Sequence, residues 1–214
     1  MNIAVVGANG NLGSRVVRRA LDAGLEVAAI VLPGASVEHV DGRAELVRGD
    51  LFSLSAADLA GAEVLVSCFG SGPADPDLNE RACIAYLELA RATGVRVVAI
   101  MGSGCLFADA AHEQLVCEGP SYSKRLAPIS LAAARGLARL DAAADVAWTV
   151  MTPQLTFDAA GPFTGAFSLD ASREVRRNDA GQSYATYEDV AQAMVDEVLA
   201  PAHVHELVSV LSPC

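Results

Sequence analysis

The sequence predicts a doubly wound α/β fold with a parallel sheet, and three observations support this prediction. Short, continuously apolar runs recur along the chain, as is typical of strands buried on both faces. Segments with helical periodicity lie between most of these runs, and right-handed crossovers of that kind make the strands parallel. A glycine-rich segment, residues 7–13, joins the first apolar run to the first helical one.

The expected elements alternate along the chain. The first strand covers residues 3–6 and ends at Gly7. Apolar residues at helical spacing begin at Leu12, and Gly24 is placed to end that helix. Further strands are expected at six other apolar runs, residues 27–31, 44–47, 64–67, 95–101, 146–151 and 207–211.

Two later helices have recognisable end signals. Asp75 and Pro76 provide an N-cap and a first-turn proline for a helix that stops before Gly94. Thr186 with Asp189 caps another helix near the end of the chain. Between them, the segment from about residue 153 to 183 is the poorest in helical period. It is expected to lie over the C-terminal edge of the sheet as a substrate-side flap or small hairpin of a single domain, residues 1–214.

The composition excludes several classes of protein. Of the 214 residues, 52% are hydrophobic and 19% are charged, which excludes a disordered or fibrous chain. Fifteen Lys and Arg against 26 Asp and Glu give a net charge of −11, which disfavours binding to nucleic acid or to an anionic membrane. No apolar run approaches the ~20 residues of a membrane span.

Cysteine and histidine usage indicates neither a disulfide scaffold nor a metal site. The five cysteines are scattered without a CxxC pair, and no targeting segment precedes the first strand, so the protein is expected in the cytoplasm. His203 and His205 have no third ligand nearby, and the sequence predicts no metal there.

The segment Gly7-Ala8-Asn9-Gly10-Asn11-Leu12-Gly13 is a GxxGxxG motif between a strand and a helix, which is the context of a dinucleotide-binding loop. Gly7 permits the tight turn, Gly10 lets backbone N–H groups approach a pyrophosphate, and Gly13 lets helix and strand pack closely. The sequence therefore predicts a Rossmann-like cofactor site. Its other expected contacts within the loop are Asn9, Asn11 and Leu12.

Nearly the whole chain resembles an atypical short-chain dehydrogenase/reductase of the NAD(P)H-binding, NmrA-like kind. It is most similar to the small bacterial proteins named NADH-flavin reductases, with biliverdin-IXβ reductase as a more distant relative. The most distinctive matching pieces are residues 146–170 and 183–210. The resemblance implies bound NADP(H) or NAD(H) and a reductase acting on flavin-like or quinone-like acceptors.

The resemblance also implies roles for residues that follow the later strands. Asp50 and Leu51 match the position that contacts adenine, and Phe69 with Gly70 lines the adenosine-ribose side. Gly102 and Ser103 lie where the nicotinamide would sit. Cys105 stands where relatives commonly have serine, which replaces a hydroxyl by a weak S–H donor.

The catalytic pair of carbonyl-reducing relatives is missing. Tyr-x-x-x-Lys puts a phenol and an ammonium on one helix face, and none of the four tyrosines has Lys four residues later. Ser103, Cys105 and Tyr122 are the remaining candidates. Hydride transfer to a flavin or quinone substrate does not require the Tyr-x-x-x-Lys pair, because the acceptor can take its proton from water. The missing pair is also compatible with a regulator that senses NAD(P) without turnover. It argues against a third hypothesis, a nucleotide-sugar epimerase or dehydratase.

The cofactor preference depends on the end of the second strand. NAD-selective proteins place an acid there and NADP-selective proteins an arginine. This chain has Leu32, where relatives usually have Arg, and Arg15 could reach back to a 2′-phosphate instead. The sequence thus predicts NADPH preferred over NADH, with NADH still accepted. A small-molecule acceptor is the expected partner, and the protein is expected to be a monomer or homodimer.

Overall fold

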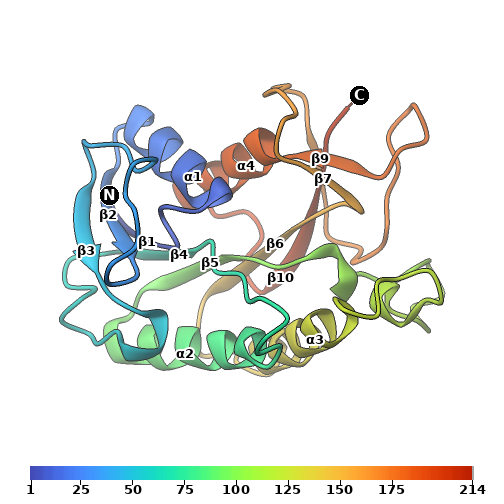
Figure 1. Ribbon diagram of the computed structural model, residues 1–214, viewed down its shortest axis with the longest axis horizontal. Coiled ribbons are helices and arrows are strands. Elements are labelled where there is room, and N and C mark those ends of the chain that lie inside the picture. Colours follow the sequence, from blue (N-terminus) through green and yellow to red (C-terminus); the bar gives the residue numbers. More distant parts are fainter. Residues whose placement is uncertain (214) are drawn as a thin grey trace.

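The eight-stranded sheet has the order β3-β2-β1-β4-β5-β6-β10-β8 in the computed structural model, which describes residues 1–213 (Figure 1). Every neighbouring pair is parallel except β10 with β8. The strands are β1 (Asn2–Val6), β2 (Glu26–Val31), β3 (Glu45–Arg48), β4 (Val64–Ser67), β5 (Arg96–Ile100), β6 (Trp148–Pro153), β8 (Ser168–Asp170) and β10 (Glu206–Leu211).

Four helices cover the two faces of the sheet. On one face, α1 (Asn11–Asp22) packs against α4 (Tyr187–Leu199), and on the other α2 (Leu78–Thr93) packs against α3 (Ala127–Asp141) (Figure 1). Each face has its own cluster of buried apolar side chains, one around Trp148 and Leu140 and the other around Val16 and Met194. The prediction of a doubly wound α/β fold is therefore confirmed. None of the described helices is long and apolar enough to cross a membrane.

The observed helix ends can be compared with the capping signals that the sequence predicts. The Thr186 side chain accepts a hydrogen bond from the Asp189 N–H at 2.9 Å, so α4 begins with the predicted cap. Gly94 ends α2 in the left-handed conformation, with φ of 80°. The expected start of α2 at Asp75 and Pro76 is wrong. Those residues form a preceding turn, in which the Leu78 N–H donates to the carbonyl of Asp75, and the helix begins only at Leu78.

The segment 153–183, expected as a flap or small hairpin, contributes short strands to two different sheets. Its strand β7 (Thr156–Asp158) pairs in parallel with β9 (Tyr184–Thr186), and β8 joins the edge of the main sheet. The buried carboxylate of Asp189 fastens this segment, because it accepts hydrogen bonds from the Thr164 N–H at 2.9 Å and from the Ser212 hydroxyl at 2.6 Å. The segment, α4 and the end of the chain are thus joined at one side chain.

The first turn of α1 packs tightly against the loop that follows β1. A Cβ at Gly13 would overlap the carbonyl oxygen of Gly7 and would lie 2.8 Å from its carbonyl carbon and 2.9 Å from the Cα of Ala8. These are backbone atoms, which cannot turn aside as the tip of a flexible side chain can. Only glycine at position 13 is compatible with this packing.

Gly13→Ala is expected to destabilise the protein by about 1–3 kcal/mol, the range for an overpacked core. Gly42→Ala is the matched control, because Gly42 has open space around its Cβ position and no positive φ. Its effect should stay within about 1 kcal/mol. Urea unfolding of both variants measures the difference, and equal midpoints would contradict the steric argument.

Candidate functional site

The loop between β1 and α1 is held as a rigid turn by its own backbone. The N–H groups of Gly7 and Ala8 both donate to the carbonyl of Ile30, at 3.1 and 3.2 Å. Gly7 has a φ of 72°, a conformation that glycine adopts without a steric cost. The N–H of Gly10 then donates to the carbonyl of Gly7 at 3.0 Å. The loop consequently has a fixed shape at the carboxyl end of β1.

The start of α1 is suited to an anion. Its N-cap is Gly10, which provides no side-chain hydrogen bond, and the first turn contains no acidic residue. The first N–H groups of a helix lack partners within the helix, and the helix dipole makes this end positive. The residues present therefore fit the pyrophosphate of a dinucleotide.

A cavity of about 220 Å³ opens beside this loop, over the ends of β1, β2 and β3. The Asp50 carboxylate in its wall accepts a hydrogen bond from the Phe52 N–H at 3.1 Å and so caps the short helical turn Leu51–Ser53. Phe52 and Phe69 pack edge to face beneath it, with ring centroids 5.5 Å apart. The sequence-predicted residues that line this adenosine-side cavity are Gly7, Asn9, Gly10, Leu32, Asp50, Leu51, Phe69 and Gly70.

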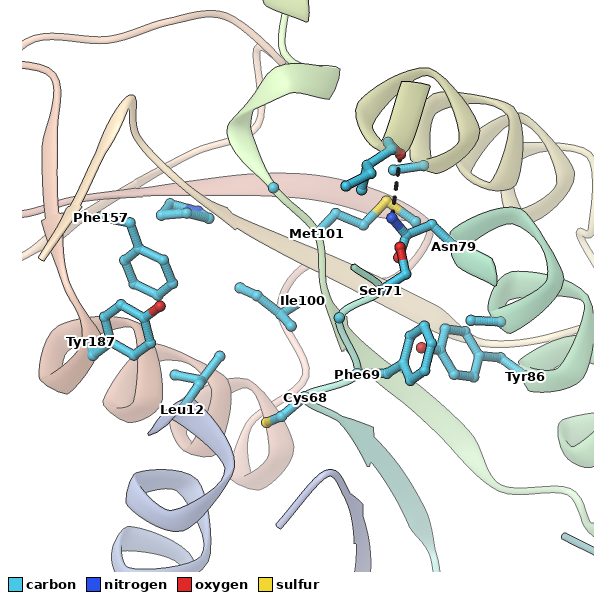
Figure 2. Close-up of a pocket in the computed structure, with 16 residues that line it drawn as sticks. Leu12, Cys68, Phe69, Ser71, Asn79, Tyr86, Ile100, Met101, Phe157 and Tyr187 are labelled. Carbon is cyan, nitrogen blue, oxygen red and sulfur yellow. Dashed lines mark hydrogen bonds between the residues drawn. The ribbon is translucent and has the colours of Figure 1, made fainter. Parts of the chain in front are cut away.

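A second cavity, of about 330 Å³, continues past the ends of β4, β5 and β6 (Figure 2). It shares Cys68, Phe69 and Gly70 with the adenosine-side cavity, so the two adjoin. Its walls come from both sides of the sheet edge, with Phe157 and Tyr187 on one side and Met101 on the other (Figure 2). Leu12 and Gly102 are the other two predicted residues that line this acceptor-side cavity.

Arg15 does not face either of these cavities. Its guanidinium donates to Glu188 at 2.9 Å, to the carbonyl of Asn11 at 2.7 Å and to the carbonyl of Ala159 at 3.0 Å. Burial opposes ionisation of Glu188, but hydrogen bonds from Arg19 and Arg18 outweigh it and hold the pKa of that carboxyl below its usual value. Arg15 thus belongs to a cluster that fastens α1 to α4, and it lines a separate cavity beside Asn9 and Gly10. A 2′-phosphate, its predicted partner, would have to compete with these contacts.

Of the three catalytic candidates, only Ser103 stays next to a cavity. It begins the short turn Ser103–Cys105, directly after the cavity-lining Gly102. Cys105 is buried with its thiol against the carbonyl of Gly102, and burial raises the pKa of this thiol to about 12. A reactive role for Cys105 is therefore disfavoured.

Tyr122 is used in packing. Its hydroxyl lies 2.8 Å from that of Ser130, and the same two side chains cover Gly104, where any Cβ would meet both. Tyr122 does not line the acceptor-side cavity. The structure therefore separates it from the position that a proton donor would need, which corrects its candidacy.

Most residues of the acceptor-side cavity were not identified from the sequence, among them Tyr187, Ser71 and Asn79. Tyr187 is the first residue of α4, and its ring stacks on Phe157 with centroids 3.7 Å apart. Ser71 and Asn79 line the opposite wall. The Thr186 cap could have placed Tyr187 at a helix start on the strand-end side of the sheet. No comparable signal marks Ser71 or Asn79.

His203 and His205 are engaged in structural contacts. His203 Nδ1 lies 2.9 Å from Glu197, and His205 Nε2 lies 2.9 Å from the carbonyl of Val146. Among residues 1–213, no group of three or more His, Cys, Asp or Glu side chains is arranged to hold a metal ion.

Comparison with known proteins agrees with this geometry. A family model described as NAD(P)H-binding matches residues 7–201. The YwnB protein of Bacillus subtilis is 32% identical over 215 residues, which cover 99% of each chain. A Streptococcus pneumoniae structure named as a putative NADH-flavin reductase superposes with a TM-score of 0.89 at 29% identity, over 99% of both chains.

A Bacteroides thetaiotaomicron structure named as a putative epimerase has a TM-score of 0.85 at 23% identity, over 100% of this chain and 97% of that one, and shows the shared fold alone. The glycine loop, the uncapped start of α1 and the two adjoining cavities are thus found in a chain that the family model covers almost completely. The chain belongs to the NAD(P)H-binding family.

Proposed function

We propose that this protein is an NADPH-dependent reductase that transfers hydride to a flavin- or quinone-like acceptor. The observation that carries the proposal is the pair of adjoining cavities along the strand ends. One lies beside the glycine loop and suits the adenosine half of a dinucleotide. The other continues past Gly102 and Pro153 and leaves room for a nicotinamide and a second ring.

The chain holds the cofactor mainly through its backbone. The first turn of α1 receives the pyrophosphate, while Asp50 and Phe69 flank the adenosine. When bound, the cofactor supplies a hydride, which is two electrons and one proton, from its dihydronicotinamide ring. The surrounding residues orient that ring and keep water away from it.

The chemistry of the acceptor-side cavity favours an acceptor that needs no proton from the protein. Its walls are mostly apolar, and no carboxylate, histidine or lysine lines it. A flavin or quinone delocalises the charge that it receives and takes its proton from water. A simple ketone would instead need an acid at its oxygen. The two phenols that line the cavity are those of Tyr86, which is paired with Ser67, and Tyr187, which stacks on Phe157, and no lysine lies beside either of them in the lining. The name of the Streptococcus pneumoniae neighbour points to the same class of reaction.

The proposal includes a cytoplasmic location. Cys68, Cys83, Cys105 and Cys117 are all free thiols. Buried free thiols are typical of proteins from reducing compartments. The name of a Burkholderia pseudomallei neighbour, a putative exported protein, refers to that protein, which is 27% identical.

Oxidation of NADPH, followed by its absorbance with FMN, riboflavin or menadione, tests the function. We expect turnover with at least one of these acceptors. Gly10→Asp should abolish this turnover, because the aspartate side chain would enter the space of the pyrophosphate. The variant should still fold, because Gly10 has a φ of −74°, which any residue can adopt. Binding of NADPH without oxidation by any acceptor would instead indicate a dinucleotide sensor.

Arg48 is a cation that the structure places beside Leu32. It ends β3, in register with Val31, and its guanidinium donates to the carbonyls of Leu32 at 3.3 Å and Ala35 at 2.7 Å. Leu32 lines the adenosine-side cavity. Arg48 does not itself line that cavity, but a 2′-phosphate would be a stronger partner than these neutral carbonyls. We therefore infer that Arg48 turns to the phosphate and replaces the arginine that relatives have at position 32.

We expect NADPH to bind about tenfold more tightly than NADH, which corresponds to about 1.4 kcal/mol. Arg48→Ala should remove most of this preference. Arg15→Ala is the control, since its contacts fasten α1 to α4, and it should leave the ratio unchanged even where it lowers stability. Calorimetric titration of both cofactors measures the ratios, and loss of the preference in Arg15→Ala alone would reverse the assignment.

Tyr122→Phe is expected to lower the turnover rate by less than about tenfold, because the hydroxyl is bonded to Ser130 outside the cavity. Loss of an essential general acid would cost about 10²–10⁴. Steady-state rates with the best acceptor decide between these ranges. A loss in the larger range, with an unchanged circular dichroism spectrum, would show that Tyr122 acts in the chemistry.

A further inference from the structure

Two small, uncharged polar side chains lie in one wall of the mostly apolar acceptor-side cavity. Ser71 lies in the segment after β4, and Asn79 lies in the first turn of α2. Both are on the side of the cavity where Met101 lies, away from the stacked rings of Phe157 and Tyr187 (Figure 2).

The hydroxyl of Ser71 is buried and has no hydrogen-bond partner among the residues that the structure describes. Leaving a buried hydroxyl unpaired costs free energy, so such atoms are uncommon and call for an explanation. Ser71 lines a cavity large enough to hold a ligand. A ligand atom that enters from that cavity would give this hydroxyl the partner that it lacks.

The amide of Asn79 has a defined orientation. Its nitrogen Nδ2 lies 3.3 Å from the carbonyl of Ile129, at the start of α3, as the dashed line in Figure 2 marks. A carbonyl oxygen only accepts hydrogen bonds, so the Asn79 atom that faces it must be the NH₂ group. The other amide atom, Oδ1, is therefore presented as an acceptor.

The remaining groups around this pair provide no competing polar contact. The hydroxyl of Tyr86 is already paired with Ser67 at 2.7 Å. Ala82, Ala133 and Met101 complete this part of the wall with apolar surface. A ligand here meets an apolar surface with one hydroxyl, which can donate or accept, and one amide oxygen, which only accepts.

We infer that Ser71 and Asn79 bind an edge of the acceptor on which a carbonyl and an N–H group are adjacent, as in the imide of a flavin ring. Ser71 donates to the carbonyl oxygen, and Asn79 Oδ1 accepts from the N–H. A quinone ring has carbonyl oxygens but no N–H, so it leaves Asn79 Oδ1 unpaired. This inference rests on the proposed reductase function and narrows its acceptor from flavins and quinones to flavins.

Lumiflavin and 3-methyllumiflavin test the inference directly, because the methyl group replaces the imide N–H and the ring is otherwise the same. Flavin fluorescence is titrated with protein saturated with NADP⁺. The wild type should bind lumiflavin about tenfold more tightly than the methylated compound, the effect of one hydrogen bond. Asn79→Leu, which removes the amide, should bind the two compounds equally.

Ser71→Ala should weaken both compounds about tenfold, since each keeps the carbonyl. Ser123→Ala, at an exposed position away from the cavity, is the matched control and should change neither affinity by more than about twofold. Equal wild-type affinity for the two flavins would overturn the inference. So would an NADP⁺ affinity that falls in Ser71→Ala by the same factor, because Ser71 would then bind the cofactor.

These titrations do not depend on turnover. Discrimination between the flavins without oxidation of NADPH would refute the reductase proposal and support the flavin site. Reduction of menadione by a protein that binds no flavin would support the reductase proposal and refute the flavin site.

Discussion

The close approach of α1 to β1 is the constraint on which the rest of the site depends. The helix can lie this near the strand only because Gly13 has no side chain to meet the carbonyl of Gly7. That approach puts the uncapped start of α1 beside the strand ends and sets Leu12 in the wall of the acceptor-side cavity. Through Glu188, which is paired with arginines of α1, the position of α4 follows from the same contact. Tyr187, at the start of α4, is consequently positioned as well.

The two halves of the site are built from different chemical groups. Around the glycine loop the shape is fixed by backbone hydrogen bonds, such as those that Gly7 and Ala8 donate to Ile30. The acceptor-side cavity is instead formed by side chains from separate segments, including the loop after β4 and the first turn of α2. Substitutions there alter shape and polarity without touching the loop, so the acceptor can change while the cofactor is retained.

The sequence is informative where a local requirement selects the residue, and uninformative where distant segments meet. Glycine at a tight turn and Thr186 at a helix start are local requirements, and both were predictable. Three-residue strands such as β7 and β8 are too short to show a periodic pattern, so their pairing could not be predicted from the sequence. Arg15 is an ordinary helix residue until Glu188, far along the chain, is brought against it. Ser71 was missed for the same reason, because only the fold encloses its hydroxyl.

The two edge strands have a consequence for how the protein behaves at high concentration. A sheet with unpaired edges can recruit strands from other molecules, and long apolar edges are the most hazardous. Here one edge is the four-residue β3, which begins at Glu45 and ends at Arg48, and the other is the three-residue β8. Asp170 in β8 is paired with Arg176 at 3.3 Å, which adds charge at that border. Short, charged edges of this kind protect a chain that is 52% hydrophobic from aggregation by strand addition.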